Sequence, residues 1–259
     1  MAKQGIVFLM YHELGIPGRE PCQKEPGYTR YVVPHAEFRK QIRHLAEEEW
    51  RGIGVGQAVR SFGRKCVCIT FDDGCETDLL CAAPVLKELG FGATFYITPG
   101  FLSRPGYLSK TQVRELHTLG FEVGCHSQTH PYLTDVNDQR LHDETTGAKQ
   151  RLEQITEASV EHFSCPGGRW DRRVLEAVKK AGFRTMATSQ TGINEASADL
   201  FELTRVPVLS GMSVQQVIRM SHGEGLLQSR VKESVRELIR GLLGNSTYDS
   251  LRSIVLRQK

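Results

Sequence analysis

Two adjacent aspartates, Asp72 and Asp73, directly follow the apolar run CVCITF of residues 66–71 and precede Gly74. Two like charges at the end of a buried strand are costly unless a cation or hydrogen-bond donors meet them. Asp-Gly is also common in surface turns, so a solvated turn is the alternative interpretation. Other residues of the chain distinguish between a solvated turn and a metal or acid–base site.

A second group of polar residues lies in GCHSQTHP, residues 124–131, where His126 and His130 are four residues apart just after another apolar run. One helical turn would bring such a pair onto one face, where two imidazoles can bind one metal ion. Pro131 disfavours helical geometry at His130, so the turn is expected to end there. This spacing alone is weak evidence, and the acidic pair at another strand end strengthens it.

The elements that position these residues follow from the alternation of short apolar runs with amphipathic stretches. Strands are predicted at 6–11, 66–71, 93–97, 121–125, 162–165, 183–188 and 205–209, and helices at 35–50, 76–90, 109–120, 138–158 and 171–182. This order predicts an α/β fold with parallel strands, either a barrel or a doubly wound sheet. In both folds the functional site lies at the C-terminal ends of the strands. The residues at such ends are His12, Asp72, Asp73, His126 and the Cys165-Pro166 pair.

Two histidines and one carboxylate leave an open coordination position for water, which is the catalytic arrangement for zinc and similar ions. Such an ion lowers the pKa of a bound water towards about 7. It also neutralises one aspartate, so that the other can stay ionised beside it and act as a base. Neighbouring side chains diverge in a strand but can converge where the strand breaks at Gly74.

Composition sets the broad class of the protein. The 259 residues suit one large α/β domain or two small ones. The 33 basic and 30 acidic residues give a net charge of +3, which does not favour nucleic acid as a partner. Seven scattered cysteines without a CxxC pair fit free thiols in a reducing compartment. No signal peptide or membrane span is recognisable, so a cytoplasmic location is expected unless a leader was removed.

Three motifs resemble the polysaccharide deacetylases, the NodB-homology group known as carbohydrate esterase family four. They are TFDDG at 70–74, HSQTH at 126–130 and CPGGRWDRRVLEAVKKAGF at 165–183, within a likeness that runs from about residue 5 to about 210. The resemblance implies a distorted (β/α) barrel and metal-dependent removal of acetyl groups from N-acetylated sugars. Carried over by position, Asp72 would be the catalytic base, and Asp73, His126 and His130 would bind a divalent metal, zinc first and cobalt or nickel as alternatives.

The chain departs from the family pattern at the third motif. The common form has an arginine two residues before the motif's proline, and here Ser164 stands in that place. The group that orients Asp72 is therefore open, with Arg205 as a candidate. The Cys75 backbone N–H is a candidate oxyanion donor, and Pro166 a candidate on the substrate side.

The second departure concerns the general acid. The family usually supplies it from a late leucine-x-histidine motif, but the late candidate here, His222, lies in a stretch predicted to be helical. The N-terminal IVFLMYHE instead places His12 at the end of a strand. This resembles the permuted arrangement of poly-N-acetylglucosamine deacetylases, so the acid role is assigned to His12, with a core or capping histidine as the alternative.

The barrel is expected to span residues 1–212 and a helical extension residues 213–259. The extension is interpreted as a cap packed on the barrel; peripheral membrane contact through its basic residues is the alternative. These residues are Arg230, Lys232, Arg236, Arg240, Arg252 and Arg257. The Gly- and Pro-rich stretch 13–34 is predicted to be a long loop over the site.

The sequence thus predicts a metal-dependent hydrolase that releases acetate from an N-acetylated amino-sugar polymer or its precursor. Two alternatives stay open: a related hydrolase of a small cyclic or linear amide, and a carbohydrate-binding descendant without activity. The particular sugar, its chain length and the oligomeric state are not readable from the sequence.

Overall fold

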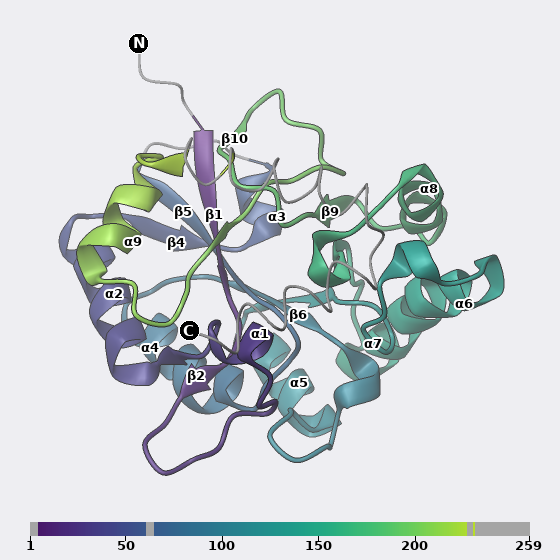
Figure 1. Cartoon of the computed structure of the whole chain (residues 1–259), viewed down its shortest axis with the longest axis horizontal. Helices are drawn as coiled ribbons and strands as arrows, with labels where there is room; N and C mark the ends of the chain where they lie inside the picture. Colours follow the sequence, from purple (N-terminus) through teal and green to yellow (C-terminus); the bar gives the residue numbers. More distant parts are fainter. Residues whose placement is uncertain (1–4, 61–64, 227–229, 231–259) are drawn as a thin grey trace.

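The computed structural model describes residues 5–60, 65–226 and 230, and these form a curled, largely parallel sheet with helices around it (Figure 1). This half-barrel confirms the predicted distorted (β/α) barrel. The strands of the main sheet are β1 (Gly5–Tyr11), β4 (Arg51–Ile53), β5 (Cys66–Phe71), β6 (Thr94–Ile97), β7 (Glu122–Cys125), β8 (His162–Ser164), β9 (Thr185–Ala187), β10 (Asn194–Glu195) and β11 (Val206–Pro207). A small separate sheet pairs β2 (Leu14–Gly15) with β3 (Val33–Pro34).

The α-helices are α1 (Pro26–Thr29), α2 (His35–Glu47), α3 (Val55–Ala58), α4 (Ala83–Glu88), α5 (Lys110–Thr118), α6 (Asp138–His142), α7 (Ala148–Thr156), α8 (Arg172–Lys180) and α9 (Val214–Ser221). Two π-helical turns, Asp78–Ala82 and Asp143–Gly147, and three short 3₁₀ turns, Pro99–Phe101, Leu133–Asp135 and Pro166–Gly168, complete the described helical segments.

The order of the strands brings the polar ends of the motifs to one edge. The sheet runs β10-β1-β5-β6-β7-β8-β9, with β11 beside β1 and β4 beside β5, and its pairs are parallel except β1 with β10. β1 and β5 are paired as far as Tyr11 opposite Phe71, so both strands end at the same level. The Asp72 N–H donates to the Tyr11 carbonyl at 3.0 Å, and the His126 N–H donates to the Ile97 carbonyl at 2.8 Å. The register therefore fixes where each site residue leaves the sheet.

The core explains why the central strands are continuous apolar runs. Every residue of β5 is buried, and β1 is buried from Ile6 onward. A parallel strand covered on both faces has no solvent-facing side, so the alternating pattern of a half-exposed strand is absent. The Phe71 ring lies between the rings of Tyr11 and Phe95, at centroid distances of 5.3 and 5.0 Å.

Two predicted helices are interrupted. The stretch 76–90 begins with the π-helical turn Asp78–Ala82, and α-helical geometry starts only at Ala83. Pro84 lies in the first turn of α4, where its missing N–H cannot bond to the turn before it. The stretch 138–158 is likewise divided into α6, a π-helical turn and α7.

Strand β4 was not predicted, because its sequence Arg-Gly-Ile has one exposed polar residue and a glycine. The glycine has a packing role: a Cβ atom on Gly52 would lie 2.2 Å from a ring carbon of Phe91. The short strands β2, β3 and β10 have two residues each and carry no periodic signal.

Of the predicted helical extension, α9 is described and packs against α2 and β1, with Val217 and Ile218 buried. Residues 227–229 and 231–259, which include most of the basic residues named above, lie outside the described part of the chain. No described helix combines the length and the apolar character that crossing a membrane requires.

Ser109 begins α5 with a reciprocal cap, and this cap predicts a stability effect. Its hydroxyl accepts a hydrogen bond from the Gln112 N–H at 3.2 Å, and the Gln112 side chain accepts one from the Ser109 N–H at 2.8 Å. Ser109→Ala should lower the free energy of unfolding by about 1 kcal/mol in urea denaturation. Ser210→Ala, at an exposed position outside any cap, is the control. Equal stability of the two variants would contradict the capping role.

Candidate active site

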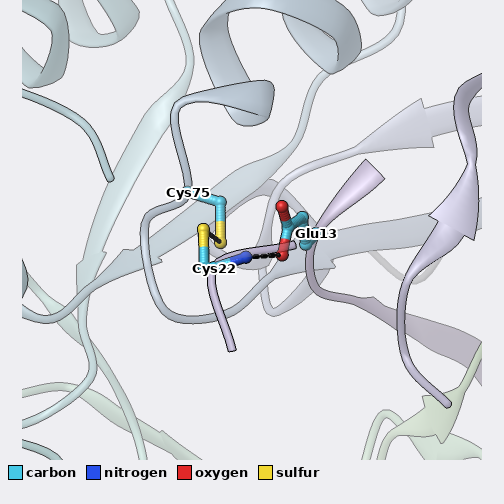
Figure 2. Close-up of side chains that lie close together, drawn as sticks. All are labelled: Glu13, Cys22 and Cys75. Atoms are coloured by element: carbon cyan, nitrogen blue, oxygen red, sulfur yellow. Dashed lines mark hydrogen bonds between the residues drawn. The ribbon is translucent and has the colours of Figure 1, made fainter. Parts of the chain in front are cut away.

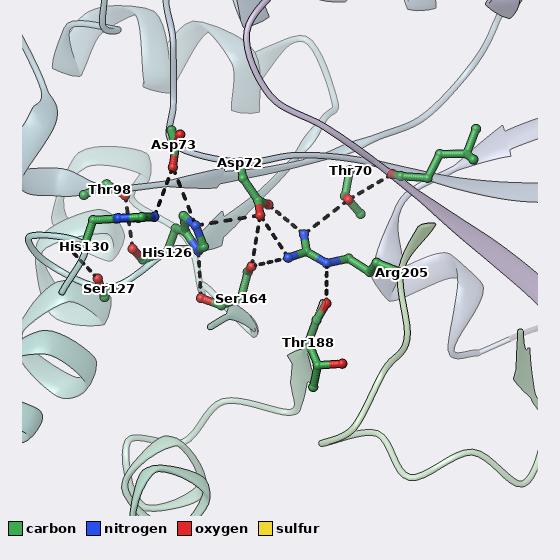
Figure 3. Close-up of polar contacts among 11 residues, drawn as sticks. Thr70, Asp72, Asp73, Thr98, His126, Ser127, His130, Ser164, Thr188 and Arg205 are labelled. Atoms are coloured by element: carbon green, nitrogen blue, oxygen red, sulfur yellow. Dashed lines mark hydrogen bonds and ion pairs between the residues drawn. The ribbon is translucent and has the colours of Figure 1, made fainter. Parts of the chain in front are cut away.

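Asp72 is held by a buried arginine. The carboxylate is 2% exposed and the Arg205 side chain is fully buried. The guanidinium binds it with two parallel hydrogen bonds, Nη1 to Oδ1 at 2.7 Å and Nη2 to Oδ2 at 2.9 Å (Figure 3). This two-point contact fixes the orientation of the carboxylate as well as its charge. The structure thus brings Arg205 to the position that the third motif leaves open.

Further hydrogen bonds fix Arg205 in turn. Its Nε donates to the Thr188 carbonyl at 2.9 Å, and Nη2 also donates to the Ser164 hydroxyl at 2.8 Å. Nη1 lies 3.5 Å from the Thr70 hydroxyl, which donates to the Leu9 carbonyl. Ser164 therefore stands where the family has an arginine and helps to hold an arginine that arrives from another strand.

The charge state of Asp72 follows from this contact. Burial by itself would raise the pKa of Asp72, but Arg205 and, to a smaller extent, His126 more than offset burial. The net effect holds the pKa of Asp72 well below its usual range, so the group is a carboxylate at neutral pH.

A second cluster lies beside this pair. Asp73, His126 and His130 each present one ligand atom, and these atoms lie within 4.8 Å of one another. The Asp73 Oδ1 atom is 3.6 Å from His126 Nε2 and 3.4 Å from His130 Nε2. Oδ1 is buried and has no hydrogen-bond partner among the described residues. This buried oxygen would gain a partner if the three side chains together bound an ion.

The tautomer of His126 supports this interpretation. Its Nδ1 is 2.8 Å from the Ser164 carbonyl oxygen, which can only accept, so Nδ1 carries the proton. Burial lowers the pKa of His126 to about 4, against the opposing effect of Asp72. The neutral ring therefore directs the lone pair of Nε2 towards two carboxylates, Asp73 at 3.6 Å and Asp72 at 3.7 Å. The Nε2 lone pair and the carboxylate oxygens are thus close together with no proton between them. Lone pairs placed in this way are the ligands that a divalent cation binds.

His130 reaches the cluster by a route that differs from the prediction. Residues 126–130 form no helical turn. Ser127 and His130 have φ values of 60° and 64°, and the His130 N–H donates to the Ser127 hydroxyl at 2.9 Å. Pro131 disfavours right-handed helical geometry at His130, and the loop adopts a positive φ there instead. The two imidazole rings nevertheless come to 4.9 Å between centroids.

The turn after β5 separates the two aspartates. Asp73 and Gly74 have φ values of 78° and 81°. A left-handed conformation costs a non-glycine residue about 1–2 kcal/mol, so the turn is strained at Asp73. This conformation sends the Asp72 side chain towards Arg205 and the Asp73 side chain towards the histidines.

A cavity of about 330 Å³ opens onto these residues. It is lined by Met10, His12, Gln23, Glu25, Gly27, Tyr28, Tyr31, Asp72, Asp73, His126, His130, Tyr132, Gly167 and Ser189. The stretch 13–34, predicted to be a loop over the site, does contribute to this lining, although it also contains β2, α1 and β3. The His12 ring stacks against Tyr31 at 4.5 Å between centroids, and its buried Nδ1 has no hydrogen-bond partner among the described residues.

The remaining sequence candidates lie apart from the cavity lining. His222 ends α9, where its ring contacts Trp50 at 4.9 Å and its Nε2 lies 3.4 Å from Glu48. Cys75 is buried behind the turn; the bonds that tie this turn to residues 106–108 come from the N–H groups of Glu76 and Leu108 and do not use the Cys75 N–H. Pro166 is buried, and its neighbour Gly167 reaches the cavity.

Sequence reasoning missed Ser164 as a hydrogen-bonding partner and the three cavity tyrosines, Tyr28, Tyr31 and Tyr132. A lone arginine at the start of the apolar run RVPVL was the signal for a buried acidic partner, because a buried charge has to be paired. No comparable signal marks the tyrosines, since the loops that place them have no periodicity.

Residues 60–186 match the family model described as polysaccharide deacetylase. This stretch, nearly half of the chain, is similar to that family. Among curated relatives, YxkH of Bacillus subtilis, which is named for the same family, is 27% identical over 187 residues, 70% of this chain and 67% of the relative. A chitooligosaccharide deacetylase of Azorhizobium caulinodans is 30% identical over 138 residues, 52% of this chain and 64% of that protein. The matches thus span about two thirds of these relatives.

Solved deacetylase structures share the fold. The Streptococcus pyogenes deacetylase PplD, solved in complex with acetate, gives a TM-score of 0.75 at 21% identity, over 85% of this chain and 99% of that one. IcaB of Ammonifex degensii gives a TM-score of 0.71 at 24% identity, over 85% of this chain and 97% of that one. At these identities the likeness concerns the arrangement of strands and helices.

The Asp72–Arg205 contact predicts a pH-dependent stability effect. Arg205→Met leaves a buried carboxylate without its partner and should lower the free energy of unfolding by about 3–5 kcal/mol near neutral pH. In the wild type the pKa of Asp72 is lower in the folded than in the unfolded protein, where it is about 3.9. Asp72 therefore stabilises the fold at pH values above about 3.9, and this stabilisation is lost as the pH falls towards the folded pKa. In the variant burial dominates and raises that pKa, so stability falls as pH rises.

Urea denaturation at pH 5 and pH 8 measures this difference. The loss of unfolding free energy in Arg205→Met should be larger at pH 8 than at pH 5. The double variant Asp72→Asn/Arg205→Met should be more stable than Arg205→Met at pH 8, and its own stability loss should depend little on pH. A loss in Arg205→Met that is the same at both pH values would show that the arginine does not set the charge of Asp72.

Proposed function

We propose that this protein is a metal-dependent hydrolase that removes N-acetyl groups from an amino-sugar polymer or its precursor and releases acetate. The observation that carries the proposal is one cavity lined by two different carboxylates. Asp72 is ionised and oriented by Arg205, and Asp73 faces two imidazoles across an unsatisfied oxygen. The match of residues 60–186 to the polysaccharide deacetylase model supports the reaction class.

The residues present fit a divalent metal. Asp73, His126 and His130 would hold it, and a carboxylate with two imidazoles suits zinc, with cobalt or nickel as substitutes. When bound, such an ion polarises the acetamide carbonyl and lowers the pKa of water. The His126 side chain is 2% exposed and that of His130 is 31% exposed, so the cluster is open on the His130 side.

Asp72 is suited to take a proton from the attacking water. It is a carboxylate at neutral pH, it lies 3.7 Å from His126 Nε2, and Arg205 holds both of its oxygens. The arginine contact also lowers the basicity of Asp72, so Asp72 is expected to pass the proton on rather than to retain it.

His12 is suited to protonate the leaving amine. It follows β1 directly and lines the same cavity as the metal cluster. Burial lowers the pKa of His12, and the charges of Asp73 and Asp72 oppose this effect. With this lowered pKa the ring is neutral at neutral pH, so His12 would first accept the proton that Asp72 takes from the attacking water and then donate it to the leaving amine. The Cys75 N–H remains the candidate donor to the oxyanion.

The cavity walls support a sugar substrate. Tyr28, Tyr31 and Tyr132 line it, and aromatic rings offer rigid apolar area with a polar tip. The relatives point the same way, since one is named a chitooligosaccharide deacetylase, and the deacetylase PplD was solved in complex with acetate.

The activity test is acetate release from N-acetylated chito-oligosaccharides, before and after treatment with a chelator. Zinc added back should restore the rate. A parallel panel of small linear and cyclic amides and ureides separates the alternative hydrolase from the deacetylase. Binding of the oligosaccharides without any release of acetate would instead identify a carbohydrate-binding protein.

Metal analysis should distinguish a proposed metal ligand from the proposed base. His126→Ala should lose one divalent ion per chain and all activity, because it removes a ligand. Asp72→Asn should keep that ion and lose turnover, because an amide accepts no proton at neutral pH. Inductively coupled plasma mass spectrometry and acetate release measure both. Metal retained in His126→Ala, or near wild-type kcat in Asp72→Asn, would contradict these roles.

His12 and His222 form a matched pair for the acid role. General acid catalysis contributes about a hundred- to ten-thousand-fold, so His12→Ala should lower kcat by that range with the metal retained. His222→Ala should leave kcat unchanged, because His222 contacts Trp50 and Glu48 away from the cavity. The reverse result would assign the acid role to the late histidine.

A further inference from the structure

A second cluster of side chains of the kinds that can bind metals includes Cys75, two residues after Asp73. Glu13, Cys22 and Cys75 converge there, as Figure 2 shows, with one ligand atom of each within 4.8 Å of the others. Glu13 and Cys75 are buried and Cys22 is half-buried. The three residues come from the end of β1, the loop at 13–34 and the turn after β5, so folding alone brings them together.

The distance between the thiols fits a shared metal ion. The sulfur atoms of Cys22 and Cys75 are 3.6 Å apart. Two zinc–sulfur bonds of about 2.3 Å at a tetrahedral angle place their sulfur atoms about 3.8 Å apart. The cysteines therefore already have nearly the separation that a common zinc ion requires.

The third ligand is held in place by hydrogen bonds. Glu13 Oε2 accepts from the Cys22 N–H and from the Tyr28 hydroxyl, each at 2.9 Å. The Tyr28 hydroxyl also lies 3.3 Å from the Cys75 sulfur. Orientation of a metal ligand by neighbouring hydrogen bonds is the usual support for such sites.

The surroundings of this cluster contain a further acidic side chain. Asp78, whose N–H donates to the Cys75 carbonyl at 3.0 Å, is fully buried, and neither of its carboxyl oxygens has a hydrogen-bond partner among the described residues. No lysine or arginine in the described part of the chain forms an ion pair with Glu13 or Asp78. A buried group of this kind is stabilised by a bound cation.

We propose that Glu13, Cys22 and Cys75 bind a second divalent ion, separate from the one expected at Asp73, His126 and His130. Two thiolates and one carboxylate select a thiophilic ion such as zinc over magnesium or calcium. The fourth position is left for water or for the Tyr28 hydroxyl. The ion joins the 13–34 loop to the turn after β5, and so holds the loop that carries Tyr28 and Tyr31 against the cavity.

Cobalt substitution separates the two sites, because only this one contains sulfur. Full-length protein is purified with a thiol reductant, stripped with a chelator and titrated with Co²⁺. Wild type should bind two ions and show the ultraviolet sulfur-to-cobalt charge-transfer absorption. Cys22→Ser and Cys75→Ser should each bind one ion and lose that absorption. Cys66→Ser, a buried cysteine at the start of β5, should behave as wild type.

The site variant His126→Ala makes the test independent of the proposed deacetylase activity. It should lose the ion of the His–Asp cluster and retain the charge-transfer absorption of the thiolate site. Zinc should also protect Cys22, the half-buried thiol, from alkylation in wild type. Wild-type protein that binds a single ion without the absorption would overturn the proposal. So would a reductant-free preparation with a Cys22–Cys75 disulfide that, after reduction, fails to bind the second ion.

Discussion

The buried ion pair between Asp72 and Arg205 is the constraint on which the site depends. A carboxylate this deeply buried is costly to ionise unless a cation meets it. Arg205 does so with two hydrogen bonds and is itself held by Thr188 and Ser164. Ser164 also fixes the proton of His126 through its carbonyl oxygen. A single residue of β8 therefore links the orientation of the candidate base to the tautomer of a candidate metal ligand.

The same need of a buried carboxylate for a partner gives the two adjacent aspartates different candidate roles. In a continuing strand the two side chains would point to opposite faces, and the left-handed conformation of Asp73 instead lets both line one cavity. One carboxylate then has a permanent cation from the protein, while the other keeps an unsatisfied oxygen for an ion from solution. The candidate base and the candidate ligand thus differ through their partners, although their residue type and position in the chain are nearly the same.

The fold could be predicted from the sequence because its central strands are fully buried. Runs such as CVCITF keep both faces apolar, and that pattern survives without any knowledge of the partners. β4 and the two-residue strands β2, β3 and β10 could not be predicted, since their side chains carry no pattern. The π-helical turn before α4 was also missed, because Pro84 marks an interruption without specifying its geometry.

The site was predictable where motif residues follow strands. Asp73, His126 and His130 do meet, although the helical turn expected for the histidines was wrong. The partner of Asp72 could only be suggested, because Arg205 lies 133 residues away and its approach depends on the closing of the sheet. The pairing of Cys22 with Cys75 was invisible for a similar reason, since no local spacing relates a loop thiol to one in a distant turn.

The pairing of β1 with β11 has a consequence for the order in which the molecule becomes competent. β1 begins the described chain, and the residues of β11 are among its later ones, yet Leu9 lies beside Val206. Contacts between such distant segments pay a large loop-closure entropy and form slowly. Arg205 directly precedes β11, so Asp72 gains its buried partner only when β1 and β11 have paired. Closure of the sheet is thus the event that completes the ion pair and fixes the orientation of this carboxylate.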